Sequence, residues 1–382
     1  MKKILIAALL LGLLVSSVFA IESGLLPIGV GGKYSGMGGA GASIVDDITA
    51  AYYNPAGIVH AGTFGLKIGA GAATKGLNDL MATFGNSSDP SKFLVDNFNK
   101  TIDVNGGINA IVGLNIANLG ISVIPVGNLA FTKPTAGTLT GTTLNGWAAY
   151  EGVLTLGHGF SLPMFPAGID LGFNVKSANY SVITEAIVSG TTSGNLNINY
   201  SGIGYDIGAK ARIDTPVVPI SVGIVMKDIS ETLKGKAKTS VTTINPVTGT
   251  SETTTPVETD VNDLPRPTTT VISASTVIPV INLKVAADID SVASYSYAVV
   301  SGAPSTAYPA YSLTHLGVEY PVLGGLIAVR GGTVSGGPAG GEISQTTYGL
   351  GVSFGLGLNV TAMIDNKNSK NNSTYADFGF AF

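Results

Sequence analysis

The chain contains no cysteine, which rules out a disulfide framework, thiol catalysis and a zinc site built on thiolates. Charged residues are scarce, at 12% of 382 residues, whereas a soluble globular domain carries about 25%. The formal net charge is −4. Nucleic-acid phosphates require clustered Lys and Arg, so we expect no nucleic-acid partner.

A long uncharged apolar run is also missing after Ala20, although the mean hydropathy is +0.39. Glycine is abundant instead, at 52 residues, close to twice its usual share of about 7%. A hydrophobic chain without a hydrophobic helix needs another way to meet lipid. Because every backbone polar group inside a bilayer must be hydrogen-bonded, the remaining spanning solution is a closed β-barrel.

The first twenty residues have the pattern of a secretory signal peptide. Lys2 and Lys3 form a basic start, residues 4–15 are uncharged and apolar apart from Gly12, and residues 18–20 form a small-x-small cleavage site. A membrane anchor is the alternative interpretation, but the apolar run is shorter than the ~20 residues that a spanning helix needs. We predict a signal peptide over residues 1–20.

From residue 64 onward apolar residues recur with period two, the spacing of a strand with one face in an apolar medium. Ile169, Leu171 and Phe173 alternate with polar residues or glycine. The same alternation recurs in residues 203–213, 220–226, 283–289, 348–356 and 358–364. A soluble β-sandwich also alternates, but its strands average about five or six residues, and these run to about ten.

Connections between these strands alternate between tight and long, as in outer-membrane barrels. The tight ones lie at residues 118–119, 161–168, 214–219, 279–282, 321–325 and 357, and the long ones at 74–106, 132–146, 181–194, 230–267, 291–310, 335–342 and 366–372. We count about fourteen strands, an even number as such barrels require. We therefore predict an all-β fold: an antiparallel transmembrane barrel of about 14 strands over residues 63–382, in the outer membrane of a Gram-negative-type envelope.

Residues 21–62 precede the first strand and are predicted to form an N-terminal plug, or hatch. An even strand count puts both barrel ends on the periplasmic side, so this segment can fold back into the lumen. A helix-like stretch runs from Ser43 and should end near Tyr53, because the residue before Pro55 avoids the helical region. The hatch is therefore predicted to contain one short helix.

The glycines of the hatch match a GxGxxG pattern at Gly36, Gly38 and Gly41. A dinucleotide site would need a preceding strand of a βαβ unit, which the sequence lacks. We interpret these glycines as positions where the backbone presses against the barrel wall.

The last residues carry an aromatic pattern on one strand face. Phe378, Phe380 and the terminal Phe382 share that face, which resembles the C-terminal signature by which outer-membrane barrels are recognised for assembly. An aromatic edge strand of a sandwich is the alternative. We expect the barrel-assembly machinery and outer-membrane lipid as partners.

Asn54, Pro55, Ala56 and Gly57 follow a glycine-rich lead-in and stand just before the first strand of an exported chain. This combination resembles the long-chain fatty-acid outer-membrane transporters of the FadL/TodX (OMPP1) family, whose fourteen-stranded barrel is plugged by a hatch with an Asn-Pro-Ala motif. The resemblance implies passive uptake of hydrophobic small molecules, gating at residues 54–57, exit sideways into the bilayer, and a monomer. Similar openings occur in barrels assigned to protein secretion, surface attachment or conjugation, so a barrel that binds partners through its external loops is the alternative function.

Two stretches are candidates for the transport path. Pro125 and Gly127 interrupt an expected strand over residues 120–131, and proline within a strand occurs at edges or bulges, so we predict a kinked third strand that forms a lateral opening; a proline at the strand end is the alternative. Residues 74–106 carry two amphipathic patterns, the second after a helix start at residues 88–90. They predict an external ligand-capture groove, or else a loop packed on the rim, through Leu77, Leu80, Met81, Phe84, Phe93, Leu94 and Phe98.

The remaining sequence features do not indicate a specific catalytic or binding site. The Thr-rich residues 238–270 suggest an outward β-ribbon. His60, His158 and His315, the three histidines, have no acidic residue at metal-ligand spacing and no nucleophile motif, so we predict no enzyme, metal or cofactor. The expected inward faces carry Gly, Asn, Thr and a few charges, and do not indicate an apolar pocket.

Overall fold

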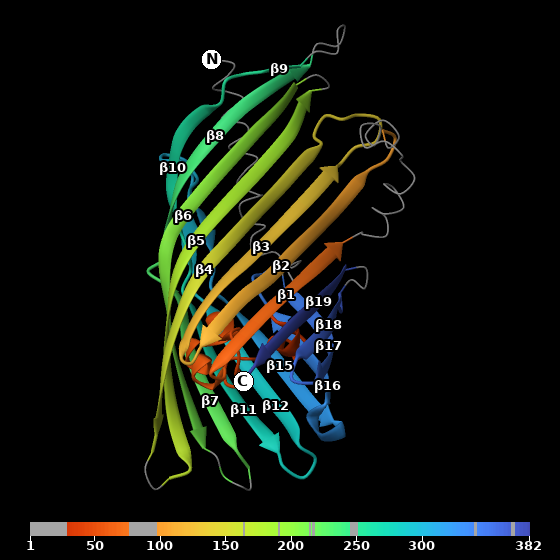
Figure 1. Ribbon diagram of the computed structural model, residues 1–382. Coiled ribbons are helices and arrows are strands. Elements are labelled where there is room, and N and C mark those ends of the chain that lie inside the picture. The colour runs from red at the N-terminus through yellow and green to blue at the C-terminus, as the bar shows by residue number, and fades with distance from the viewer. Residues whose placement is uncertain are drawn as a thin grey trace.

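A strand pair between the two ends of the wall closes the barrel in the computed structural model. β1 (Phe64–Lys75) pairs along its length with β19 (Asn371–Ala381) and with β2 (Ile102–Ile116). The structure describes residues 29–75, 98–162, 165–189, 192–213, 215, 218–244, 251–339, 342–367 and 371–382. The result is the predicted all-β fold, a closed antiparallel barrel with 14 wall strands (Figure 1).

The remaining elements follow in chain order. The strands are β3 (Leu119–Lys133), β4 (Thr143–Ser161), β5 (Ala167–Ser189), β6 (Thr192–Ile213), β7 (Ile220–Ile229), β8 (Thr232–Ile244), β9 (Ser251–Thr253), β10 (Val257–Pro265), β11 (Thr269–Ile278), β12 (Leu283–Val292), β13 (Tyr295–Tyr297), β14 (Thr306–Tyr308), β15 (Tyr311–Val322), β16 (Ile327–Gly336), β17 (Ile343–Ser353) and β18 (Gly357–Asp365). The helical turns are α2 (Gly32–Ser35), α3 (Ala50–Tyr53), η2 (Pro55–His60) and η4 (Leu323–Gly325). None of the helices in these described ranges is long and apolar enough to cross a membrane.

Two neighbouring strands of the wall are each broken once and carry two labels. β7 and β8 form one of these wall strands, and β11 and β10 form the other. β6 pairs with β7 toward the end with the short turns and with β8 toward the other end, and β11 and β10 pair with β7 and β8 in turn. Asp228 and Ser230 have positive φ angles at the first break, and Pro265 and Pro267 flank the second, where a strand proline cannot donate to a ladder. The prediction of a long external loop over residues 230–267 is therefore wrong in part. Most of this range forms β8 and β10, which extend the wall.

The wall is apolar outside and polar inside over its lower part. On β6, Ile203, Tyr205 and Ile207 are exposed on the outer face, while Asp206 and Lys210 are buried on the inner face. An exposed apolar band of this extent would be unfavourable in water and fits the hydrocarbon layer of a membrane. The end with the short turns, at the bottom of Figure 1, is the periplasmic end.

The predicted aromatic face of the last strand is present. Phe378 and Phe382 are exposed, and the ring centroid of Phe64 lies 6.0 Å from that of Phe380 and 5.8 Å from that of Phe382. The three terminal phenylalanines thus lie on the outer face, beside the β1–β19 closure. Their role in assembly stays a prediction.

The part of the N-terminal segment that the structure describes, residues 29–63, lies inside the lower half of the barrel (Figure 1). The helix expected from Ser43 is shorter than predicted, because α3 begins at Ala50. Before it the chain turns: the Asp47 carboxylate accepts from the Thr49 backbone N–H at 2.8 Å, and such local hydrogen bonds compete with a helix. Residues 1–28, which include the predicted signal peptide, lie outside the described residues.

Candidate functional site

The Asn54-Pro55-Ala56-Gly57 turn joins two helical turns inside the barrel. Asn54 has extended backbone angles that end α3, and its side-chain oxygen accepts from the Ala56 N–H at 3.0 Å. Its side-chain nitrogen donates to the carbonyl of Ala42 at 2.9 Å and to that of Ala209, on β6, at 3.2 Å. Pro55 then opens η2, where a missing N–H costs nothing. All four residues are buried.

Glycines of the wall make room for this turn. A Cβ at Gly172 on β5 would collide with the backbone of Pro55 and Ala56, and one at Gly208 on β6 would collide with the Asn54 side chain. These two glycines face each other as a register pair. The period-two pattern predicts only that both positions lie on the polar face of their strands. Glycines at inward positions of neighbouring strands are the signal in the sequence for this contact.

A second contact joins the N-terminal segment to the opposite wall. A Cβ at Gly317 or Gly332 would collide with the backbone of Met37 or Gly38, and the Gly38 N–H donates to the Thr347 hydroxyl at 2.9 Å. A Cβ at Gly36 would lie 3.0 Å from the Cα of Gly349 on β17, so the predicted close packing against the wall is confirmed for Gly36 and Gly38. At Gly41 an added Cβ would meet Tyr53 of the segment itself, while the Gly41 N–H donates to the Asp288 carboxylate of β12 at 2.8 Å.

Two ion pairs stabilise the same segment, one within it and one to the wall strand β1. Lys33 contacts Asp46 at 2.7 Å, and Lys67 of β1 contacts Asp47 at 2.5 Å. Burial alone would raise the pKa of both carboxyl groups, but Lys33 beside Asp46 and Lys67 beside Asp47 outweigh it and hold both pKa values below the usual range. Both carboxylates therefore stay charged at neutral pH.

A cavity of about 270 Å³, here called the inner cavity, lies directly above this segment. Ala51 and Tyr52 form its floor, and Ile124, Val126 and Trp147 line one apolar side. Tyr52 is the segment's one large apolar side chain among the described residues with substantial exposure, at 37%. The cavity thus offers an apolar surface within the lumen, against the N-terminal segment.

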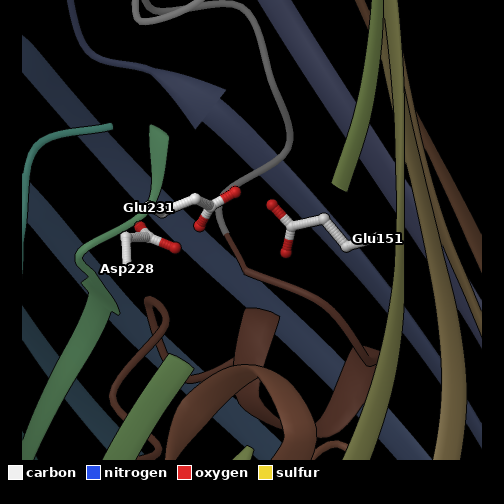
Figure 2. A group of neighbouring side chains, drawn as sticks. All are labelled: Glu151, Asp228 and Glu231. Atoms are coloured by element: carbon white, nitrogen blue, oxygen red, sulfur yellow. The ribbon is translucent and has the colours of Figure 1, made fainter. Parts of the chain in front are cut away.

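The opposite side of the inner cavity is charged and lies at the two wall breaks. Figure 2 shows Glu151, Asp228 and Glu231 converging there. Arg266 contacts Glu151 at 3.4 Å and Asp228 at 3.3 Å, and Lys176 also pairs with Asp228. Because these cations supply positive charge to the carboxylates, we interpret the group as an ion-pair network that holds the broken strands together.

The outer face of the wall carries an apolar hollow of about 400 Å³, here called the outer hollow. Its floor is made of small residues, namely Gly106, Gly127, Gly146 and Ala148, and its rim includes Ile108, Leu129, Leu144 and Ile183. Ile108 and Leu129 are exposed on the lipid-facing side. Small or absent side chains on three adjacent strands, β2, β3 and β4, therefore leave a depression on the lipid-facing surface.

Pro125 lies within β3 rather than at its end. The β2–β3 register runs through Asn109↔Val126 and resumes at Val112↔Val123 with two residue pairs missing between them, whereas the β3–β4 ladder is continuous through Pro125↔Tyr150. Proline lacks the N–H that one of these bonds needs. The ladder is interrupted on one side of β3 without a change of register.

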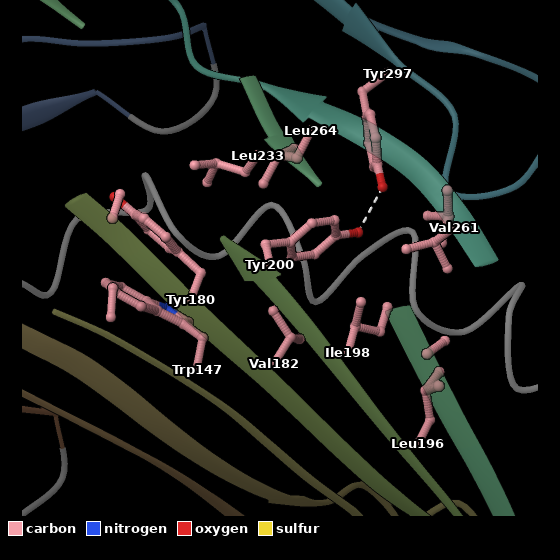
Figure 3. Close-up of a cluster of buried hydrophobic side chains, with 14 residues drawn as sticks. Trp147, Tyr180, Val182, Leu196, Ile198, Tyr200, Leu233, Val261, Leu264 and Tyr297 are labelled. Carbon is pink, nitrogen blue, oxygen red and sulfur yellow. Dashed lines mark hydrogen bonds between the residues drawn. The ribbon is translucent and has the colours of Figure 1, made fainter. Parts of the chain in front are cut away.

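Above the inner cavity, the lumen contains an apolar cluster, here called the upper cluster (Figure 3). It comprises Trp147, Ala149, Ala178, Tyr180, Val182, Leu196, Ile198, Tyr200, Leu233, Ala237, Val261, Leu264, Tyr297 and Val299. The expectation that the inner face lacks apolar character is wrong here. On β6 the apolar residues switch from the odd positions of residues 203–213 to the even positions Leu196, Ile198 and Tyr200, a phase reversal that the sequence contained.

The predicted capture groove falls almost wholly on residues 76–97, which lie outside the described residues. This applies to Leu77, Leu80, Met81, Phe84, Phe93 and Leu94. Phe98 is described: it is exposed, its carbonyl accepts from the Lys133 ammonium at 2.6 Å, and that ammonium lies 5.7 Å from its ring centroid.

Solved structures with the same architecture extend over nearly the whole chain. The Pseudomonas putida toluene transporter TodX aligns with a TM-score of 0.60 at 12% identity, covering 93% of this chain and 99% of that one. This chain has the fold of the FadL/TodX-type barrels. The CymD monoaromatic hydrocarbon channel gives a TM-score of 0.58 at 14% identity over 93% and 98%, and a Pseudomonas aeruginosa FadL homologue 0.58 at 10% over 94% and 98%.

No protein-family model and no curated protein sequence matches the chain. The similarity to these barrels is therefore one of fold. A closed barrel with an apolar outer band is the form in which chains span the Gram-negative outer membrane, and the predicted location agrees with it.

Proposed function

We propose that the chain is an outer-membrane channel for the uptake of hydrophobic small molecules, such as aromatic hydrocarbons or long-chain fatty acids. The observation that carries the proposal is the relation between the two cavities. Val126 lines the inner cavity and the next residue, Gly127, lines the outer hollow. Trp147 lines both. A single thickness of wall separates them, beside the interrupted ladder at Pro125.

In this mechanism residues 21–62 act as the hatch. The turn at Asn54, Pro55, Ala56 and Gly57 seats it against the wall glycines Gly172 and Gly208 and is the proposed gating element. A solute captured at the external loops, with Phe98 in the capture groove, enters the lumen and stops at the inner cavity because the hatch blocks the periplasmic exit.

Lateral exit follows from the energetics of an apolar solute. Transfer from water to hydrocarbon gains about 0.8 kcal/mol per CH₂, so the bilayer beyond the outer hollow is a sink and passive diffusion suffices. A small widening between β2 and β3 at Pro125 would connect the two cavities. We propose this gap as the lateral opening, and a monomer as the functional unit since one chain supplies the whole path.

A disulfide across the gap between β2 and β3 tests this route. The chain has no native cysteine, so no other disulfide can form. Continued register would put Ala110 opposite Pro125. We expect an oxidised Ala110→Cys/Pro125→Cys variant in proteoliposomes to take up labelled toluene or oleate more slowly than the same variant after reduction. The reduced variant, which has a backbone N–H at position 125, should itself be slower than the wild type. The matched control is Leu114→Cys/Ile121→Cys, an outward pair in the regular part of the same ladder.

Two outcomes would contradict the proposal in different ways. Equal uptake by the oxidised and reduced gap variants would remove the lateral route. Uptake no faster than in empty liposomes, for every solute and variant, would remove transport and favour a barrel that serves secretion, attachment or conjugation through its loops.

A further inference from the structure

The connection between β12 and β15 folds into the external half of the lumen. β13 and β14 pair with each other as a separate two-stranded sheet and are not part of the wall ladder. Asn262 of β10 ties this hairpin to the wall: its N–H donates to the Val299 carbonyl at 2.9 Å and its side chain to that of Ala298 at 2.7 Å. A hairpin outside the wall ladder can open locally at less cost than a wall strand.

Tyr297 is the part of this hairpin that enters the upper cluster. Its side chain is 3% exposed, and its hydroxyl lies 2.6 Å from the hydroxyl of Tyr200 on β6, as Figure 3 shows. The same hydroxyl donates to the carbonyl of Asn262 at 3.4 Å. The ring belongs to the apolar cluster that includes Val261 and Leu264. Its seat therefore combines apolar walls with hydroxyl-binding groups at one end.

This seat adjoins the proposed path of the solute. Trp147 and Tyr180 belong to the upper cluster and also line the inner cavity. The indole N–H of Trp147 is buried and has no hydrogen-bond partner among the described residues. A ligand that moves from the seat to the inner cavity could therefore accept a hydrogen bond from the Trp147 indole N–H.

A tyrosine side chain is p-cresol attached to a backbone. We propose that the seat of Tyr297 is a binding site for phenolic monoaromatic compounds, and that Tyr297 occupies it while the hairpin is closed. The site rests on the proposed uptake function, since it gives that function a ligand class. A pocket built to hydrogen-bond a hydroxyl discriminates against the analogue that lacks it, because its polar groups are then left unpaired.

The test measures binding of p-cresol and toluene to the purified barrel by calorimetry. Tyr297→Ala vacates the seat and should bind p-cresol at least about tenfold more tightly than the wild type, with a preference over toluene of about three- to tenfold. Adding Tyr200→Phe should reduce that preference, since only the Asn262 carbonyl then remains to bind the hydroxyl. Tyr320→Ala, which removes a ring from the outer face of β15, should behave as the wild type.

The fluorescence of Trp147, the chain's one tryptophan, locates the bound ligand. Its emission should change on p-cresol binding to Tyr297→Ala and stay unchanged at the same concentration in Tyr320→Ala. Equal affinity of the wild type and Tyr297→Ala, or a preference that Tyr200→Phe leaves undiminished, would overturn the proposal.

A second variant guards against failed assembly of Tyr297→Ala. Tyr297→Phe keeps the ring but loses the bond to Tyr200, so p-cresol should displace it more easily and bind more tightly than to the wild type; no difference would count against the site. Binding in detergent is independent of transport. A barrel that transports toluene but does not bind p-cresol loses this site alone, and one that binds p-cresol without uptake loses the uptake function alone.

Discussion

Gly208 on β6 lies so close to Asn54 that a methyl group at position 208 would collide with the carboxamide oxygen of Asn54. Its register partner Gly172 is equally close to the Pro55–Ala56 peptide. The wall and the turn are therefore complementary in shape. A substitution can be made on either side of this contact while the other side keeps its native residues.

Gly208→Ala should displace the Asn54-Pro55 turn from its groove. The added methyl group meets a buried amide and the proline ring, and overpacking of this kind costs about 1–3 kcal/mol. We expect faster hydrogen exchange of residues 50–60 and a higher leak of small polar solutes in liposome swelling. Gly152→Ala is the control, since a Cβ there meets nothing within 4 Å; matching behaviour of the two variants would show that the groove does not hold the turn.

Asn54→Ala should loosen the same turn from the other side. It removes the bonds to the Ala42 and Ala209 carbonyls, and leaving buried carbonyls unpaired costs about 1–3 kcal/mol. Exchange at residues 41–43, 56 and 57 should rise, while the wall strands keep wild-type protection. Asn366→Ala, an exposed site, should leave these rates as they are; unchanged protection around Ala42 in Asn54→Ala would refute the role of this side chain.

Acid should release the N-terminal segment only well below neutral pH. Asp46 and Asp47 have pKa values below the usual range because Lys33 and Lys67 outweigh the effect of burial. A depressed pKa contributes stability above the unfolded value of about 3.9, and that stability is lost as pH falls through the folded value. Hydrogen exchange of residues 44–48, corrected for its intrinsic pH dependence, should show constant protection between pH 5 and 8 and a decline below about pH 4. Loss of protection between pH 7 and 5 would contradict this assignment.

Much of the fold could be predicted from the sequence because one face of every wall strand meets lipid. The alternation at Ile169, Leu171 and Phe173 and the outward face of Phe378 and Phe382 follow from that single condition. The rule weakens where the wall leaves the membrane. There the outward residues of β6 include Asn195 and Asn197, and the loop predicted over residues 181–194 is instead strand for most of its length.

The candidate site was less predictable because it depends on register. The Asn54-Pro55 turn is visible in the sequence, but the glycines that receive it lie more than a hundred residues away, and only strand pairing brings them together. The ion pairs of Arg266 with Glu151 and Asp228 likewise depend on strand pairing, because it brings the break after β10 next to the break after β7. Sequence periodicity describes each strand alone, and no local pattern reports which residues become neighbours across the lumen.

Pro125→Ala should slow the release of solute into the bilayer. Alanine restores the N–H that the β2–β3 ladder lacks between Asn109↔Val126 and Val112↔Val123, and one additional hydrogen bond stabilises the closed wall by about 0.5–1.5 kcal/mol. If widening at this gap limits the rate, uptake of labelled toluene should fall about two- to tenfold. Pro321→Ala is the control, since Pro321 lies near the periplasmic end of β15, where the paired register with Ala328 is intact. Uptake that falls equally in both variants would assign the loss to general stiffening of the wall, whereas an unchanged rate in Pro125→Ala would remove β3 from the exit route.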